Sequence, residues 1–457
     1  MEHSTKTPRN NLRNYQLQKL RKLLKLQSCN QFYNATLQSL AGIDDLSCIE
    51  EFTSTIPFTD KQQLISDQLN HPPFGTDLSC HLDQYRRFHQ TTGTTATPLR
   101  WLDTEESWQA ILNCWQQIYR AAGVVATDRL CFAFSFGPFL GFWSAFEAAT
   151  QLGCLAIPTG GMTSQARIQL ILDTQSTVLC CTPSYALRLA QVAEEAKLDI
   201  ATSCIQRIIV AGEPGGSIPA TRTLIEKAWN ARVYDHHGMT ETGPISYPCP
   251  LHKDTLHILE ESYFAEIIDP TDQSTVERGK TGELVITTLD RYASPLLRYR
   301  TGDLVQASPR PCSCGSPHLT LVGGILGRRD DMLIVRGVNV YPSAIEELVR
   351  KFAAAAEYRV IVDQRSALTE ICLQIELEFN AQADTIRNDL RQAIAISMGL
   401  RTQVEVVPPG TLPRQEMKAQ RWIYLNPDEH LESLSGHDRT SSLTRDGQQR
   451  PHPSPSN

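Results

Sequence analysis

Short apolar runs alternate with helical stretches between residues 100 and 235, and no other feature limits the possible folds as much. The apolar runs are RLCFAFSF (129–136), CLAIPT (154–159), STVLCCTP (176–183) and CIQRIIVAG (204–212). Helical stretches such as GFWSAFEAATQLG separate them. Buried strands that alternate with helices in this way predict a largely parallel sheet with helices on both faces.

The pattern after residue 327 is that of a smaller domain. In SAIEELVRKF, the residues Ile345, Leu348, Val349 and Phe352 follow the spacing of one helix face. Strand-like and helical stretches then follow in the order strand, strand, helix, strand, at 358–363, 370–378, 384–398 and 402–407.

These patterns predict an α/β protein of two domains. We expect a large N-terminal α/β domain with mostly parallel sheets covered by helices (1–327) and a small, mobile C-terminal α+β domain (328–425). Residues 426–457 contain almost no apolar side chains, so we expect a disordered tail there.

Composition excludes several classes of protein. The net charge of −7, from 43 basic and 50 acidic residues, argues against nucleic-acid binding, because no basic excess is available to neutralise phosphates. No apolar run is long enough for a membrane span, and no secretory signal peptide is evident, so we expect a cytoplasmic location. The 13 cysteines therefore predict reduced thiols rather than a disulfide framework.

The N-terminal stretch places Leu17, Leu20 and Leu24 on one face of a helix. This spacing predicts an amphipathic helix on the protein surface. A targeting or membrane-surface helix is the alternative.

The stretch HQTTGTTATPLRW (89–101) is rich in threonine around one glycine. Hydroxyl groups and unhindered backbone N–H groups in such a loop can surround a phosphate, although the Gly-Lys-Ser/Thr ending of a Walker loop is missing. A threonine-rich surface loop without a ligand would have the same composition. Four further stretches, in a fixed order, favour the phosphate interpretation: YDHHGMTETGP (234–244), LLRYRTGDLV (296–305), GRRDDMLIVRGVNVYPSAIE (327–346) and LPRQEMKAQRW (412–422).

Together these stretches resemble the adenylate-forming superfamily of acyl-CoA synthetases, adenylation domains and luciferases, and within it the phenylacetate–CoA ligase family. IPFTDKQQL (56–64), GCLAIPTGG (153–161) and TPSYAL (182–187) extend the resemblance over roughly residues 10–425. The resemblance implies that a carboxylic acid reacts with ATP to give an acyl-adenylate and pyrophosphate, and that the acyl group then passes to the thiol of CoA. It also implies Mg²⁺ as a cofactor, and dimers are common among these enzymes. Transfer to a carrier-protein thiol or an amine is the first alternative, and a non-catalytic nucleotide-binding protein is the second.

The resemblance assigns catalytic roles to three residues. Thr240 would contact the α-phosphate, Glu241 would hold Mg²⁺, and Lys418 would bridge the acid and the α-phosphate. Asp303 would accept hydrogen bonds from the ribose hydroxyls, and Arg328 would contact ribose or phosphate. The remaining nucleotide-binding positions are Thr91, Thr92, Gly93, Thr94, Thr95, Glu213, Pro214, Asp235, His236, His237, Gly238 and Met239.

His237 occupies the position where the family usually has tyrosine against adenine, and a packed structural pair of His236 and His237 is the alternative. Asp330 matches the hinge about which the small domain rotates between the two half-reactions. The acid is expected to contact an apolar slot suited to an aromatic acid, although the aromatic residues could equally belong to the core. The residues of this slot are Phe136, Phe139, Gly212, His237, Gly243 and Pro244.

Cysteine and histidine gather in CPLHKDTLH (249–257) and PCSCG (311–315), which is the usual composition of a closed zinc site. The resemblance implies a structural Zn²⁺ held by Cys249, His257, Cys312 and Cys314, and His257 fits better than His252. Free thiols at a turn are the alternative.

Two departures from the family pattern concern mobile segments. Ala96 and Thr97 replace the second glycine and the lysine of the phosphate loop, and Glu416 and Met417 stand where glycine commonly precedes the lysine. Alanine does not readily adopt positive φ, so we expect a less mobile loop. Thr97 removes a cation from around the pyrophosphate, so we expect weaker ATP binding in an active enzyme.

Overall fold

The structure is a computed structural model that describes residues 8–38, 46–91, 98–336, 338–352, 354–365, 369–378, 381–414 and 421–425. Several predictions concern residues outside these ranges. They are the loop residues from Thr92 to Thr97, the segment with Glu416, Met417 and Lys418, and the tail 426–457.

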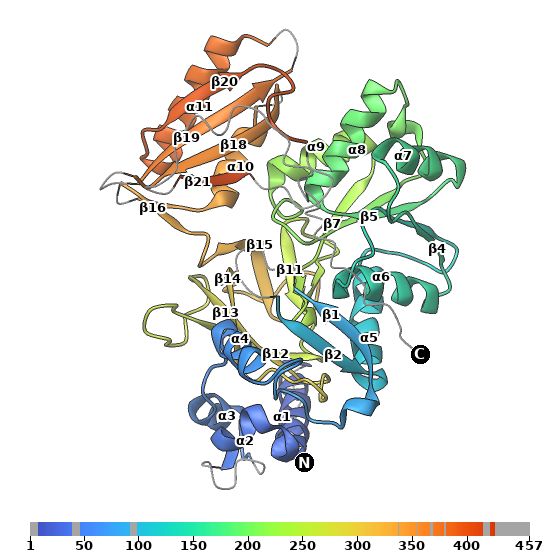
Figure 1. Ribbon diagram of the computed structural model, residues 1–457, viewed down its shortest axis with the longest axis vertical. Coiled ribbons are helices and arrows are strands. Elements are labelled where there is room, and N and C mark those ends of the chain that lie inside the picture. Colours follow the sequence, from blue (N-terminus) through green and yellow to red (C-terminus); the bar gives the residue numbers. More distant parts are fainter. Residues whose placement is uncertain are drawn as a thin grey trace, which may run out of the picture.

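The large domain begins with helices and a hairpin, continues as alternating strands and helices, and ends in antiparallel strands (Figure 1). The first elements are α1 (Pro8–Leu26), α2 (Gln31–Gln38), α3 (Ile49–Thr55), α4 (Lys61–Asn70), β1 (Tyr85–Gln90), β2 (Arg100–Thr104) and α5 (Glu105–Ala121). The alternating elements are β3 (Arg129–Phe132), α6 (Leu140–Gln151), β4 (Leu155–Pro158), α7 (Ser164–Asp173), β5 (Val178–Cys181), α8 (Pro183–Glu195), β6 (Arg207–Val210), α9 (Pro219–Trp229) and β7 (Arg232–Asp235).

The predicted parallel sheet is confirmed, with strand order β4-β3-β5-β6-β7 and every pair parallel. The side chains of successive residues in β5 point to opposite faces of this sheet. Leu179 and Cys181 pack with residues of α7, α8 and α9, whereas Val178 and Cys180 pack with residues of α5 and α6. Because helices cover both faces of the sheet, every side chain of β5 is buried, and a fully apolar sequence stabilises this strand.

An antiparallel sheet, which the sequence patterns did not predict, forms the rest of the large domain. Its strand order is β10-β11-β15-β14-β13-β12, and a small hairpin of β8 and β9 precedes it. The strands are β8 (Gly238–Met239), β9 (Gly243–Pro244), β10 (Ser246–Pro248), β11 (Thr255–Ile258), β12 (Tyr263–Ile268), β13 (Thr281–Thr288), β14 (Tyr299–Ala307) and β15 (Thr320–Arg328).

The small domain has the predicted order of helix, strand, strand, helix, strand. Its elements are β16 (Leu333–Val335), β17 (Val338–Val340), α10 (Pro342–Arg350), β18 (Ala355–Asp363), β19 (Glu370–Leu377), α11 (Ala383–Met398), β20 (Gln403–Val407) and β21 (Trp422–Leu425). The sheet order is β20-β19-β18-β21, and β21 is an additional strand that runs parallel to β18. Only four residues long, β21 lacks a periodic pattern that would have revealed it.

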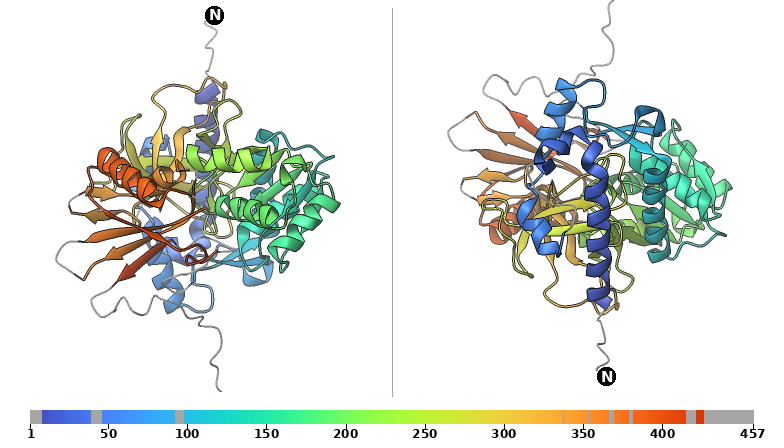
Figure 2. Two further views of the ribbon diagram at one scale, coloured as in Figure 1. Left: turned by 90° about the horizontal axis from the view of Figure 1, so that it is seen from above. Right: turned by 90° about the horizontal axis from the view of Figure 1, so that it is seen from below.

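The two domains meet where α10 packs against α9. Figure 2 shows the small domain, in orange, beside the green helices of the large domain. The hydroxyl of Thr221 in α9 donates to Glu346 of α10 at 3.3 Å, and the backbone N–H of Ala220 donates to Glu347 at 3.2 Å. These polar contacts are of the kind found between domains that change their relative positions.

Helix α1 confirms the amphipathic surface helix. Leu20 and Leu24 are buried in one cluster with Phe52 and Leu297, so the apolar stripe faces the protein core. In the part of the chain that the structure describes, no helix combines the length and the apolar character needed to cross a membrane.

Glu376 of β19 anchors the segment that leads toward Lys418. Its buried carboxylate accepts hydrogen bonds from the N–H groups of Gly410 and Leu412, at 2.8 and 3.0 Å, and from the guanidinium of Arg414. Burial opposes ionisation, but Arg414 and the two N–H donors hold the pKa of Glu376 below its usual value.

We predict that Glu376→Gln lowers the free energy of local unfolding around β19 and β20 by about 2 kcal/mol, because the charged acceptor is lost. Hydrogen exchange of the amides in these strands measures this change. Glu378→Gln, at an exposed position nearby, is the control and should have no effect.

Because the pKa of Glu376 is depressed in the fold, its stabilisation is complete above the ordinary glutamate pKa and is lost as the pH falls. The difference in the free energy of local unfolding between Glu376→Gln and wild type should therefore become smaller at acidic pH. A difference that is independent of pH would contradict this interpretation.

Candidate active site

A tight hairpin presents Thr240 and Glu241. Strands β8 and β9 pair Gly238 with Pro244 and Met239 with Gly243, and the turn between them holds the two residues. A Cβ atom on Gly238 would lie 2.9 Å from the carbonyl oxygen of Gly243 and from the Cα of Pro244. Glycine is therefore required at this close approach of two backbones.

Glu241 is buried, and two groups from other elements contact its carboxylate. The Nζ of Lys61, the first residue of α4, lies 3.2 Å from Oε1, and the hydroxyl of Tyr299 in β14 lies 3.5 Å from the same oxygen. A buried carboxylate with its partners gathered at one oxygen has the chemistry of a ligand for a hard cation.

Asp303 lies four residues beyond Tyr299 on β14 and is also buried. Its Oδ1 accepts a hydrogen bond from Nη1 of Arg328 at 3.0 Å, and its Oδ2 lies 2.9 Å from Nε2 of His237. Although burial opposes ionisation, His237 and Arg328 hold the pKa of Asp303 below its usual value. The structure thus brings three predicted nucleotide-binding residues into one contact network.

The two adjacent histidines have different surroundings. His236 is buried against the edge of Trp115, with ring centroids 4.5 Å apart, and burial lowers its pKa to about 3, so it is neutral near pH 7. His237 accepts hydrogen bonds at its carbonyl from Ile245 and Ser246 and directs its ring toward Asp303. His236 therefore has a core position, whereas His237 lies at the site.

The predicted residues just before this hairpin make local contacts. Glu213 accepts a hydrogen bond from the N–H of Ser184 at 2.7 Å, at the start of α8. Asp235 accepts one from the hydroxyl of Ser217 at 2.5 Å, and burial raises the pKa of Asp235 to about 6. Gly212 has a φ of +92°, which glycine adopts without strain.

Thr91 closes the base of the threonine-rich loop. Its N–H donates to the carbonyl of Leu99 at 2.9 Å, and its hydroxyl accepts from the N–H of Leu99 at 3.0 Å. The N–H of Gln90 donates to the carbonyl of Pro138 at 2.8 Å. The loop base is thereby joined to the aromatic segment predicted to contact the acid.

That aromatic segment packs largely with itself. Phe136 contacts Trp143 and Phe146, with ring centroids 5.0 and 5.6 Å apart, and Phe139 contacts Phe142 at 5.9 Å. Phe136 also packs against the core cluster of α5 and α6. Both phenylalanines are only partly buried, so each combines core packing with accessible surface.

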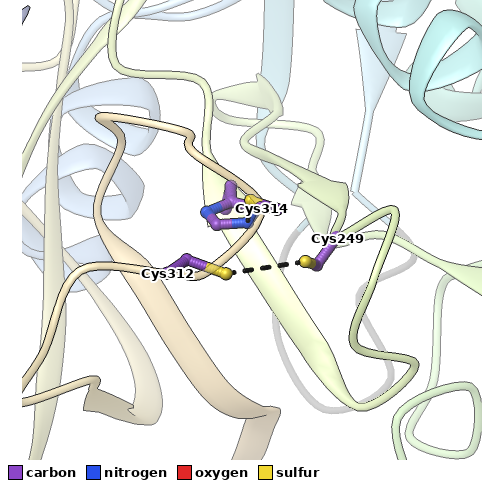
Figure 3. Close-up of side chains that lie close together, drawn as sticks. Cys249, Cys312 and Cys314 are labelled. Atoms are coloured by element: carbon purple, nitrogen blue, oxygen red, sulfur yellow. Dashed lines mark hydrogen bonds between the residues drawn. The ribbon is translucent and has the colours of Figure 1, made fainter.

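The four predicted zinc ligands converge at one end of the antiparallel sheet. Cys249 Sγ and Cys312 Sγ are 3.7 Å apart, and Cys314 lies beside them (Figure 3). Cys314 Sγ is 3.3 Å from Nε2 of His257. All four ligand atoms lie within 4.8 Å of one another. Zn–S bonds of about 2.3 Å in a tetrahedron place neighbouring sulfurs about 3.8 Å apart, so the donor set and spacing fit Zn²⁺.

The alternative ligand His252 is exposed and contacts the hydroxyl of Ser313 at 2.7 Å. The structure therefore favours His257 for this cluster. Asp330, the predicted hinge residue, is exposed and pairs with Arg329, whose Nη1 also lies 3.4 Å from buried Glu283.

Three residues at the site were not among the sequence predictions: Lys61, Tyr299 and Arg291. Lys61 and Tyr299 belong to stretches that carry the family resemblance, IPFTDKQQL and LLRYRTGDLV, so their motifs were a usable signal. Arg291 donates to the carbonyls of Thr240 and Glu241, and no motif marks it.

Comparison with known proteins decides the family. Residues 79–289 match the family model of the AMP-binding enzyme, and residues 337–425 match that of the AMP-binding enzyme C-terminal domain. The phenylacetate-coenzyme A ligase of Pseudomonas putida is 33% identical over 422 residues, which cover 89% of this chain and 93% of the relative. The chain belongs to the phenylacetate–CoA ligase family. It is an acid–thiol ligase that adenylates a carboxylic acid with ATP and then forms a thioester.

Two structures of 2-hydroxyisobutyryl-CoA ligase indicate which domain arrangement this chain adopts. The postadenylation state with 2-HIB-AMP has a TM-score of 0.87, with 27% identity and coverage of 94% of this chain and 92% of that chain. The thioesterification state with 2-HIB-AMP and CoA has a TM-score of 0.69, with 29% identity and coverage of 92% and 91%. The domain arrangement of this chain is therefore nearer to the postadenylation state.

We predict that Gly238→Ala lowers the rate of adenylation at least about tenfold, because the added methyl group displaces the turn that carries Thr240 and Glu241. Acid-dependent pyrophosphate release measures the effect. Gly399→Ala, at a positive φ but with open space around the added atom, is a control for glycine loss elsewhere. Unchanged pyrophosphate release in Gly238→Ala would contradict the role of the hairpin.

Proposed function

We propose that this chain activates an aromatic, phenylacetate-like acid and transfers its acyl group to CoA, using Mg²⁺ during adenylation. This proposal is supported mainly by the placement of Thr240 and Glu241 beside the contact network of Asp303, His237 and Arg328. Tyr299 and Asp303 on one strand connect the two groups. Groups suited to phosphate, a cation and ribose are thus placed near one another.

In the proposed adenylation step, a carboxylate oxygen of the acid attacks the α-phosphorus of ATP, and pyrophosphate leaves. Thr240 hydrogen-bonds the α-phosphate, and Glu241 provides a carboxylate oxygen for Mg²⁺. Asp303 accepts from the ribose hydroxyls, His237 contacts adenine, and Lys418 bridges the two reacting anions. Thr91, Thr92, Gly93, Thr94 and Thr95 surround the β- and γ-phosphates.

In the second step, the thiol of CoA attacks the acyl carbon, and AMP leaves. Rotation of the small domain about Asp330 exchanges the groups that face the acyl-adenylate. The domain arrangement near the postadenylation state supports such a rotation, since the related ligase has been captured in both arrangements.

An aromatic acid is favoured by the partly accessible rings of Phe136 and Phe139, which offer flat apolar surface beside the base of the threonine loop. The related Pseudomonas putida enzyme is named for phenylacetate. A carrier-protein thiol or an amine in place of CoA is the alternative acceptor, and the assay below distinguishes it.

We also propose a structural Zn²⁺ held by Cys249, His257, Cys312 and Cys314. These ligands lie between β10, β11 and the turn before β15, and their contacts do not include Thr240, Glu241 or Asp303. A closed set of four protein ligands leaves no position for substrate, so the metal would stabilise the sheet.

The proposed reaction is tested by pyrophosphate release over a panel of aromatic and aliphatic acids, with and without CoA. We expect release with phenylacetate-like acids and formation of the corresponding CoA thioester. Pyrophosphate without thioester would favour the carrier or amine acceptor, and no pyrophosphate with any acid would contradict the function.

Lys418→Ala should reduce adenylation about 100-fold or more, because charge repulsion between acid and phosphate is no longer offset. The thioester step from supplied acyl-adenylate should be retained. Lys280→Ala, at an exposed turn, is the matched control. Normal adenylation by Lys418→Ala would show that another group bridges the anions.

Metal analysis of the purified protein should find one zinc per chain, and Cys312→Ser/Cys314→Ser should lose the zinc and melt at lower temperature. Cys204→Ser, at an exposed cysteine away from the cluster, should keep both properties. The site would be refuted by zinc-free wild-type protein or by full occupancy in the double variant.

A further inference from the structure

Arg291 uses every nitrogen of its guanidinium group in a buried position. Nε and Nη2 donate to the two carboxylate oxygens of Asp103, both at 2.6 Å. Nη1 donates to the carbonyl of Thr240 at 3.0 Å and to the carbonyl of Glu241 at 2.6 Å. Arg291 is 2% exposed and Asp103 is fully buried.

These contacts join three separate parts of the chain. Asp103 lies on β2, four residues after Leu99, which closes the base of the threonine-rich loop with Thr91. Arg291 lies between β13 and β14, and its guanidinium also covers the ring of Trp101 from β2 at 5.2 Å. The strand that ends the loop and the turn that presents Thr240 are therefore fixed to one cation.

Stability alone is a weak explanation for this arrangement. A buried ion pair can often be replaced by apolar residues without loss of stability, because desolvation of the charges offsets their attraction. The planar guanidinium instead supplies geometry, since it binds a carboxylate with two parallel hydrogen bonds and keeps a third nitrogen in the same plane. Here that third nitrogen holds the two carbonyls of the hairpin turn.

We propose that Arg291, held in place by Asp103, is a positioning residue for adenylation, which rests on the roles proposed for Thr240 and Glu241. It fixes the Thr240 hydroxyl and the Glu241 carboxylate relative to strand β2 while the α-phosphate is attacked. Pyrophosphate and its cation have left before CoA reacts. The thioester step therefore no longer needs the Glu241 carboxylate for a cation. It depends less on this alignment, although the α-phosphate of the acyl-adenylate still lies beside Thr240.

The test separates the two half-reactions in Arg291→Lys and Asp103→Asn. Adenylation is followed by acid-dependent exchange of pyrophosphate with ATP. Thioester formation is followed with CoA and the synthetic adenylate of the panel acid that gives the fastest pyrophosphate release. We expect the kcat of exchange to fall about 30-fold or more, because small displacements of reacting groups are costly, while thioester formation changes less than about threefold.

A second buried pair supplies matched controls. Arg298 binds Glu266 with two hydrogen bonds of 3.0 and 2.7 Å and donates to the carbonyl of Ile56 at 2.5 Å. This pair repeats the chemistry of Arg291 and Asp103, but it does not contact the hairpin. Arg298→Lys and Glu266→Gln should lower thermal stability and leave the ratio of the two half-reactions unchanged.

An equal loss of both half-reactions in Arg291→Lys would overturn the proposal. The proposal would also fail if Arg298→Lys lowered the rate of adenylation relative to thioester formation to the same extent. If Asp103→Asn does not fold, Arg291→Lys decides alone, because it retains the charge opposite Asp103. Absence of exchange in the wild-type protein would instead contradict the proposed function. The failures of the two proposals are therefore distinguishable.

Discussion

The buried ion pair of Asp103 and Arg291 connects two parts of the molecule to which the proposed chemistry is assigned. It links the strand that ends the threonine-rich loop to the turn that carries Thr240 and Glu241, and both partners are almost completely withdrawn from water. The buried guanidinium of Arg291 has few alternative positions, because each of its nitrogens donates a hydrogen bond to an oxygen. Rigidity at the turn follows from these hydrogen bonds and from the close backbone approach at Gly238.

The remaining half of the site is built on the antiparallel sheet, which also leads into the small domain. Asp303 on β14 contacts Arg328 at the end of β15, so the proposed ribose contact lies directly beside the domain boundary. His237 occupies an oxygen of Asp303 that ribose would need on this assignment. Nucleotide binding would then replace the contact between His237 and Asp303 with a hydrogen bond from ribose.

Periodicity predicted much of the fold because it reports burial directly. The fully apolar β5 predicted the parallel sheet. The helix face of Ile345, Leu348 and Val349 predicted α10. The short β21 was not predicted, because four residues are too few to show a periodic pattern. Its pairing with β18 is set by tertiary contacts. For the candidate site, motifs predicted Thr240, Glu241 and Asp303. They could not identify Arg291, because its partner Asp103 lies 188 positions away and only the fold brings the two together.

In the proposed site, one nucleotide binds around Thr240, Glu241 and Asp303, and Arg291 holds the hairpin in place. A crystal structure with Mg²⁺ and a non-hydrolysable ATP analogue tests it most directly. We expect Mg²⁺ about 2.1 Å from a Glu241 oxygen, the α-phosphate within hydrogen-bond distance of Thr240, and Arg291 still bonded to both carbonyls. A nucleotide bound elsewhere, or one bound here with Arg291 turned away from the hairpin, would contradict it.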